Sequence, residues 1–194
     1  MQNYDKLMQS ILDGLDGRKP TLLLHSCCAP CSTAVIEKLN SFFELTVFFY
    51  NPNMDTEEEY NLRLTEQKRL CEMQGIKVIE IGYNSDAYNL AVVGLENEKE
   101  GGSRCEKCFK LRLDKTAEIA KSNKIEFFTT TLTVSPLKNA NKLNEIGFAS
   151  EKNYGVKFLP SDFKKHNGYL RSIELSKEHN LYRQNYCGCK YSKR

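Results

Sequence analysis

Residues 21–31 read Thr-Leu-Leu-Leu-His-Ser-Cys-Cys-Ala-Pro-Cys. The run Thr21–His25 is short and apolar, which is typical of a buried strand. Small residues and Pro30 interrupt it, and Ser32–Leu39 then has the composition of a helix. The stretch therefore predicts a strand, a loop and a helix in succession, with adjacent cysteines directly after the strand.

The same alternation continues along the chain. Further strands are predicted at 45–50, 76–81 and 125–131, and further helices at 57–73, 107–122 and 171–180. Thr56 before three glutamates is typical of a capped helix start, and Gly75 of a helix stop. Alternation of this kind predicts an α/β fold, a Rossmann-like parallel sheet with helices on both faces, whose functional loops lie at the carboxyl ends of the strands.

Length and composition favour one folded unit. A chain of 194 residues can bury one sizeable core, so we expect a single catalytic domain over residues 1–194. Within it, residues 1–20 form an N-terminal extension, and residues 160–194 form a cysteine-rich C-terminal segment that folds over the active site. We find no secretory signal and no run near the roughly 20 apolar residues of a membrane helix. These features predict a cytoplasmic protein without a membrane partner.

The cysteines carry most of the functional information. The chain has eight, and all but Cys71 fall in three groups, which are Cys27, Cys28 and Cys31, then Cys105 and Cys108, then Cys187 and Cys189. A reducing cytosol disfavours structural disulfides and favours metal binding or redox catalysis. We therefore predict a redox metal site built from the three groups. Cys71 falls in the middle of an amphipathic helix and is predicted to pack in the protein core.

An iron-sulfur cluster is the metal centre that we favour. The two-residue spacing of Cys105 and Cys108 lets both thiolates converge on one site at a helix start, where the helix dipole lowers their pKa. Together with Cys27 and Cys28 they make four ligands. A structural zinc ion would also accept four thiolates in two pairs. Adjacent cysteines are awkward for one small ion, but in an irregular loop both can point at a multinuclear cluster.

The remaining cysteines have more than one interpretation. One glycine between Cys187 and Cys189 allows a strained ring if the sulfurs join, and strained disulfides are easily reduced. A redox-active dithiol is the functional interpretation, and extra metal ligands are the alternative. Cys31 is either a further ligand, to a second metal ion, or a helix-facing thiol beside the site.

Four motifs together resemble the QueH family of epoxyqueuosine reductases. They occur in consistent order from about residue 21 to 192 and comprise residues 25–31, 104–109 with Arg112 and Leu113, 130–136 with Lys138, and 182–189. The resemblance implies reduction of the epoxide of epoxyqueuosine to queuosine at the wobble position of tRNA. It further implies a 4Fe-4S cluster on Cys27, Cys28, Cys105 and Cys108, and a redox-active disulfide between Cys187 and Cys189.

The residues are consistent with that chemistry. Removing an epoxide oxygen takes two electrons and two protons, so a one-electron cluster needs either two turns or a second redox store. The dithiol would be such a store, whereas a second metal ion, iron, near Cys31 would act as a Lewis acid on the epoxide oxygen. The candidate proton donors are His25, Asp162 and Tyr186, of which His25 is equally well explained as a structural histidine.

The expected partners are tRNA carrying epoxyqueuosine in its anticodon and an unidentified electron donor. Basic residues beside the second and third cysteine groups are candidates to neutralise phosphates, and they comprise Arg104, Lys107, Lys110, Arg112, Arg183, Lys190, Lys193 and Arg194. Tyr182 and Tyr186 could stack on an unpaired base. The alternative is a solvated charged face with core tyrosines.

Two other classes of function are compatible with the motifs considered separately. One is a zinc-stabilised nucleic-acid-binding module without catalysis, and the other is a thiol oxidoreductase that acts on proteins. ATP is not an expected ligand, because the loop Thr131–Lys138 lacks the glycine pattern of a nucleotide site.

Overall fold

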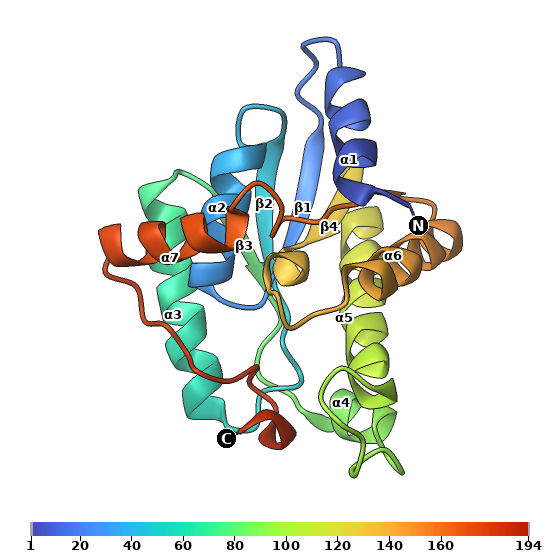
Figure 1. Ribbon diagram of the computed structural model, residues 1–194, viewed down its shortest axis with the longest axis vertical. Coiled ribbons are helices and arrows are strands. Elements are labelled where there is room, and N and C mark those ends of the chain that lie inside the picture. The colour runs from blue at the N-terminus through green and yellow to red at the C-terminus, as the bar shows by residue number, and fades with distance from the viewer. Residues whose placement is uncertain (1, 194) are drawn as a thin grey trace.

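A computed structural model describes residues 2–193 of the chain (Figure 1). The strands are β1 Thr21–Ser26, β2 Glu44–Phe49, β3 Lys77–Glu80, β4 Phe127–Thr130 and β5 Lys157–Phe158. The α-helices are α1 Tyr4–Asp13, α2 Ala29–Leu39, α3 Glu57–Met73, α4 Asp86–Ala91, α5 Ser103–Ser122, α6 Ala140–Tyr154 and α7 Gly168–Glu178. Short 3-10 helices span η1 Thr131–Val134 and η2 Lys190–Ser192.

The sheet is parallel throughout and confirms the predicted α/β fold. Its strand order is β3-β2-β1-β4-β5, with β1 in the centre between β2 and β4. The chain first adds strands on one side of β1 and then continues on the other side. Ligands of open parallel sheets bind at this kind of reversal, outside the carboxyl ends of the strands. The loops after β1 and β4 therefore frame the expected site.

Two large apolar clusters form most of the core, one on each face of the sheet. Leu22 and Leu24 point into one cluster and Leu23 into the other, as the two-residue period of a strand requires. Figure 1 shows α2, α3 and α7 on one side of the sheet and α5 and α6 on the other. Burial of both faces explains why β1 is a continuous apolar run without alternation.

The N-terminal residues are part of this core. Met8 and Leu12 of α1 are 0% and 3% exposed and belong to the same cluster as Leu22. The segment that we expected to be an extension therefore packs on the sheet. No helix within residues 2–193 is long and apolar enough to cross a bilayer.

Two helices begin earlier than predicted, and this changes the setting of the cysteines. Helix α2 begins at Ala29, with Cys28 as its cap, and α5 begins at Ser103 with Gly102 as its cap. Cys31 and Cys105 thus lie in first helical turns, where free backbone N–H groups favour negative charge.

Strand β5 was not predicted, because two residues leave no periodic pattern to detect.

Candidate active site

Two adjoining cavities lie at the carboxyl edge of the sheet, and both are lined by cysteine. The first has a volume of about 290 Å³ and is lined by Cys27, Cys31 and Cys187 among others. Cys105, Cys108, Cys187 and Cys189 line the second, smaller cavity. Cys187 thus borders both. The structure brings the three cysteine groups together at one place, while Cys71 lies in the core as predicted.

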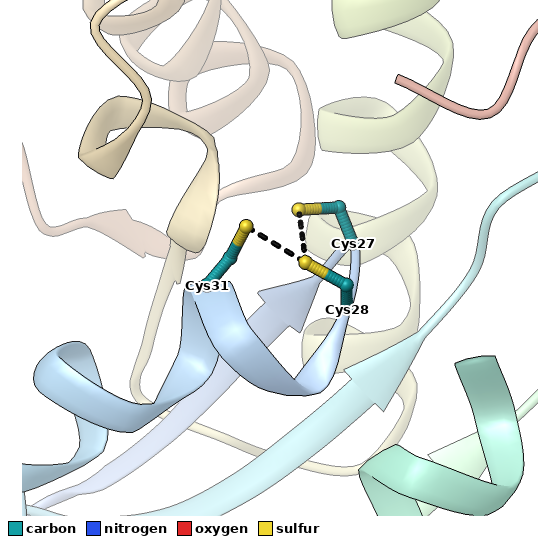
Figure 2. Close-up of side chains that lie close together, drawn as sticks. All are labelled: Cys27, Cys28 and Cys31. Atoms are coloured by element: carbon teal, nitrogen blue, oxygen red, sulfur yellow. Dashed lines mark hydrogen bonds between the residues drawn. The ribbon is translucent and has the colours of Figure 1, made fainter. Parts of the chain in front are cut away.

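Cys27, Cys28 and Cys31 form the tightest group of sulfur atoms (Figure 2). The Sγ atoms of Cys27 and Cys28 are 3.7 Å apart, and those of Cys28 and Cys31 are 2.7 Å apart. Extended backbone at Cys28 and the first turn of α2 turn the side chains toward one another. Within residues 2–193 this is the one group of three or more metal-ligating residues whose ligand atoms all lie within 4.8 Å of one another.

The three thiols differ in acidity. Hydrogen bonds from Cys28 and Cys31 hold the pKa of the Cys27 thiol well below its usual range, and the charges of Arg112 and Lys138 act in the same direction. Burial raises the pKa of Cys28 to about 12. The first negative charge of the group therefore resides on Cys27.

Helix α5 supplies the opposite wall of the site. Cys105 and Cys108 are three residues apart and so lie on the same face of the helix. The backbone N–H of Gly101 donates to Cys105 Sγ at 3.2 Å. Cys108 is buried, and burial raises the pKa of its thiol to about 12. Such a thiol needs a metal ion or a nearby cation to ionise.

Arg112, one turn after Cys108, is that cation. It is 1% exposed, and its Nη1 lies 4.0 Å from Cys108 Sγ. Its Nε donates to His25 Nε2 at 3.2 Å and its Nη2 to Asn51 Oδ1 at 2.5 Å. Within residues 2–193, no carboxylate forms an ion pair with Arg112. A buried guanidinium is thus aimed at thiols and neutral groups.

The structure corrects the expected role of two basic residues. Arg112 and Arg104 were candidates for neutralising tRNA phosphates, but both are buried. The Nη1 of Arg104 donates to the carbonyl oxygens of residues 95, 96 and 98. Both arginines lie on the inner face of α5, whereas Lys107 and Lys110 lie on its exposed face. The prediction was wrong for these two because a cluster of charges in the sequence does not reveal helix phase.

The donor set fits a thiolate-bound metal centre. Lys138 also lines both cavities without an ion pair to any carboxylate of residues 2–193, and its Nζ donates to Cys187 Sγ at 3.4 Å. Buried cations require nearby negative charge. Thiolates on a metal or an iron-sulfur cluster supply that charge, and cysteine thiolates are the usual ligands of such clusters.

The predicted proton donors have different surroundings. His25 is fully buried between Thr130 Oγ1 and the Tyr50 carbonyl, and burial together with Arg112 lowers its pKa to about 3, which keeps it neutral. Asp162 pairs with Lys164 at 2.7 Å. Tyr186 lines the first cavity, but its hydroxyl donates to Asp55 at 2.9 Å.

The C-terminal segment is held against the site by α3 and the loop before it. Buried Arg63 donates to the carbonyl oxygens of Tyr186 and Cys187, both at 3.3 Å. The Asp55 N–H donates to the Gly188 carbonyl at 3.0 Å. Gly188 has φ +113°, a conformation that side chains rarely adopt, and an added Cβ would lie 3.3 Å from Arg63. Cys187 and Cys189 are free thiols here.

Sequence reasoning missed the positions of Lys138 and Arg63. Lys138 was noted only as part of a motif, and Arg63 was one of many charges on a polar helix. Lys138 follows a predicted strand whose carboxyl end lies at the site, and this position was the signal that could have identified it. Arg63 gave none, because its contacts join residues more than 120 positions apart.

A parallel α/β domain with three cysteine groups, buried Arg112 and half-buried Lys138 at its sheet edge defines a protein with a thiolate-rich metal or redox site. The comparisons name the family. The family model "Epoxyqueuosine reductase QueH" matches residues 22–194, and the chain belongs to this family.

Relatives named epoxyqueuosine reductase QueH are similar over most of this chain. The protein of Streptococcus pyogenes is 42% identical, covering 98% of this chain and 78% of the relative. That of Staphylococcus epidermidis is 40% identical, covering 98% and 84%. The Thermotoga maritima protein is 37% identical, covering 89% and 90%.

Solved structures share the fold at low sequence identity. The U34-tRNA thiolase NcsA of Methanococcus maripaludis, solved with its [4Fe-4S] cluster, superposes with a TM-score of 0.57 at 14% identity, covering 97% of this chain and 68% of the thiolase. A predicted tRNA methyltransferase subunit of Methanocaldococcus jannaschii gives 0.50 at 12% identity, covering 81% and 76%. These likenesses establish a common architecture.

Proposed function

We propose that this chain reduces the epoxide of epoxyqueuosine in tRNA, and so forms queuosine, at a 4Fe-4S cluster in the cysteine-lined cavities. One observation carries the proposal. In a member of this family, three cysteine groups from distant parts of the chain meet at the strand-order reversal, beside buried Arg112 and half-buried Lys138, neither of which forms an ion pair with a carboxylate of residues 2–193.

The proposed cluster ligands are Cys27, Cys28, Cys105 and Cys108. The loop after β1 presents the first pair, and the N-terminal turns of α5 present the second. Arg112 and Lys138 offset the negative charge of this ligand set. When bound, such a cluster supplies electrons one at a time, and a low-potential external donor must replace them.

Two further roles are part of the proposal. Cys187 and Cys189 serve as a redox-active pair that stores electrons for the two-electron reaction. Cys31 binds a second metal ion, iron, next to the cluster, and the 2.7 Å separation of its Sγ from that of Cys28 supports this role.

The proposed tRNA surface surrounds the mouth of the first cavity. Arg183 lines that cavity, and the other exposed basic candidates for phosphate contacts are Lys107, Lys110, Lys190 and Lys193, of which Lys110 and Lys193 pair with Asp114 and Asp55. Arg194, also a candidate, lies outside the described residues. Tyr186 lines the cavity and Tyr182 is 37% exposed, so either ring is placed to stack on an unpaired base. The reaction as proposed does not use ATP.

Purification without oxygen tests the cofactor and the reaction together. The full chain is expected to be brown, to contain iron in excess of acid-labile sulfide because the second iron ion brings no sulfide, and to convert epoxyqueuosine tRNA to queuosine tRNA when dithionite is added. Nucleoside analysis by mass spectrometry measures the conversion, with cluster-free protein as control. A colourless protein that contains zinc and leaves the tRNA unchanged would refute the proposal.

Substitution of Cys187 tests the redox pair separately. Cys187→Ala is expected to keep the iron, the sulfide and the visible absorption while the steady-state conversion rate falls, because the thiol pair can no longer hold electrons. Conversion under several reductants is the measurement, and Cys71→Ala is the matched control in the core. Full activity of Cys187→Ala with every reductant would exclude the redox role.

A further inference from the structure

The oxygen that leaves the epoxide needs a proton, and the three donors predicted from the sequence are poorly suited to give it. The His25 ring is fully buried and lines neither cavity described above. Asp162 is paired with Lys164. The hydroxyl of Tyr186 already donates its proton to a carboxylate oxygen of Asp55 at 2.9 Å.

Lys138 has the position that the others lack. It lies in the loop between η1 and α6, at the carboxyl end of β4 and thus beside the loop of β1 that carries Cys27. Its side chain lines both cavities, and its Nζ donates to Cys187 Sγ at 3.4 Å. A group bound in either cavity therefore meets this ammonium.

The surroundings of Lys138 keep its proton available. Among residues 2–193 no carboxylate forms an ion pair with Lys138, and its one side-chain hydrogen bond is to the sulfur of Cys187. Burial by itself lowers the pKa of the lysine, but its electrostatic interactions with Cys187 and Cys27 outweigh burial and raise the pKa above its usual range. The group is therefore an ammonium at neutral pH, with its charge facing the cavities.

We propose that Lys138 is the catalytic acid that protonates the epoxide oxygen as the first C–O bond breaks. The inference rests on the proposed function. An alkoxide is a stronger base than an amine, so transfer from an ammonium is favourable even at a raised pKa. Arg63 and Arg183 also line the first cavity, but a guanidinium does not give up its proton in proteins.

Two electrons from a low-potential one-electron donor and two protons enter the reaction. Cleavage of the first C–O bond leaves the oxygen on one carbon, where it takes the proton of Lys138 and becomes a hydroxyl. Cleavage of the second C–O bond, with a second proton from solvent, releases water and leaves a carbon–carbon double bond.

Two substitutions separate proton donation from charge. Lys138→Arg keeps a cation beside Cys187 but removes the transferable proton, and Lys138→Ala removes both. In the anaerobically purified full chain with epoxyqueuosine tRNA and dithionite, both are expected to slow conversion by about 10²–10⁴-fold, the usual range for loss of a general acid. For Lys138→Arg, which keeps the positive charge beside the cluster ligands, iron and sulfide content, thermal melting and tRNA retention on filters should match the wild type.

Chemical rescue supplies the decisive readout. Added methylammonium should restore conversion by Lys138→Ala, since it fits the vacated space and donates a proton, but should leave Lys138→Arg slow. Lys152→Ala, at the exposed far end of α6, is the control. Wild-type rates for Lys138→Arg, or no rescue of Lys138→Ala, would overturn this inference alone. Absence of conversion by the wild type would instead overturn the proposed function.

Discussion

Replacing Cys108 by alanine is expected to remove both the visible absorption of the cluster and all measurable conversion of epoxyqueuosine tRNA. Cys108 is buried 4.0 Å from the guanidinium of Arg112 and lines the second cavity beside Cys105. Without Cys108, the cluster has three thiolate ligands, and Cys105 is the one that remains on α5. Iron and sulfide analysis and nucleoside mass spectrometry measure the two losses.

The control for this substitution is Cys71→Ala. Cys71 is 0% exposed in the core, where the Gln67 amide donates to its sulfur at 3.2 Å. This variant should keep its cluster and its activity and lower the free energy of unfolding by about 1 kcal/mol, a common effect of a core substitution. If Cys108→Ala kept its iron while Cys31→Ala lost it, the proposed ligand set would be wrong, and the Cys27, Cys28 and Cys31 group would be the metal site.

Replacing Arg112 by methionine is expected to destabilise the cluster-loaded protein far more than the cluster-free protein. In the loaded protein the guanidinium offsets the charge of thiolate ligands, and breaking a buried ion pair costs about 3–5 kcal/mol. In the cluster-free protein the buried thiol of Cys108 is neutral, so the cation has less to offset. Urea unfolding of both forms under anaerobic conditions gives the two values.

The same substitution should change the electronic properties of the cluster. Loss of a positive charge makes addition of an electron less favourable, so the midpoint potential should become more negative. Arg112→Lys, which retains the charge but not both hydrogen bonds to His25 and Asn51, should lie between wild type and Arg112→Met. Equal destabilisation of the loaded and cluster-free forms would mean that Arg112 acts only through His25 and Asn51.

Local patterns in the sequence were enough to predict the main architecture. The apolar run before Cys27 and the aromatic run at 45–50 specify buried strands, because a parallel sheet covered on both faces needs no polar alternation. In a parallel α/β fold the functional loops follow the carboxyl ends of the strands, so the fold class also predicted that the loop after β1 contributes to the site. Strand β5 escaped prediction because its pairing with β4, and not its own two residues, makes it a strand.

The residue types of the site can be read from the sequence, since seven cysteines in clustered spacings indicate metal or redox chemistry wherever they fold. Which charged side chains lie beside these cysteines depends on the tertiary structure. Helix phase turns Arg112 inward and Lys107 outward, and the crossing from β4 to α6 carries Lys138 to Cys187, 49 positions away. Burial and long-range contact set the protonation and electrostatics of a site, and neither is encoded in local spacing.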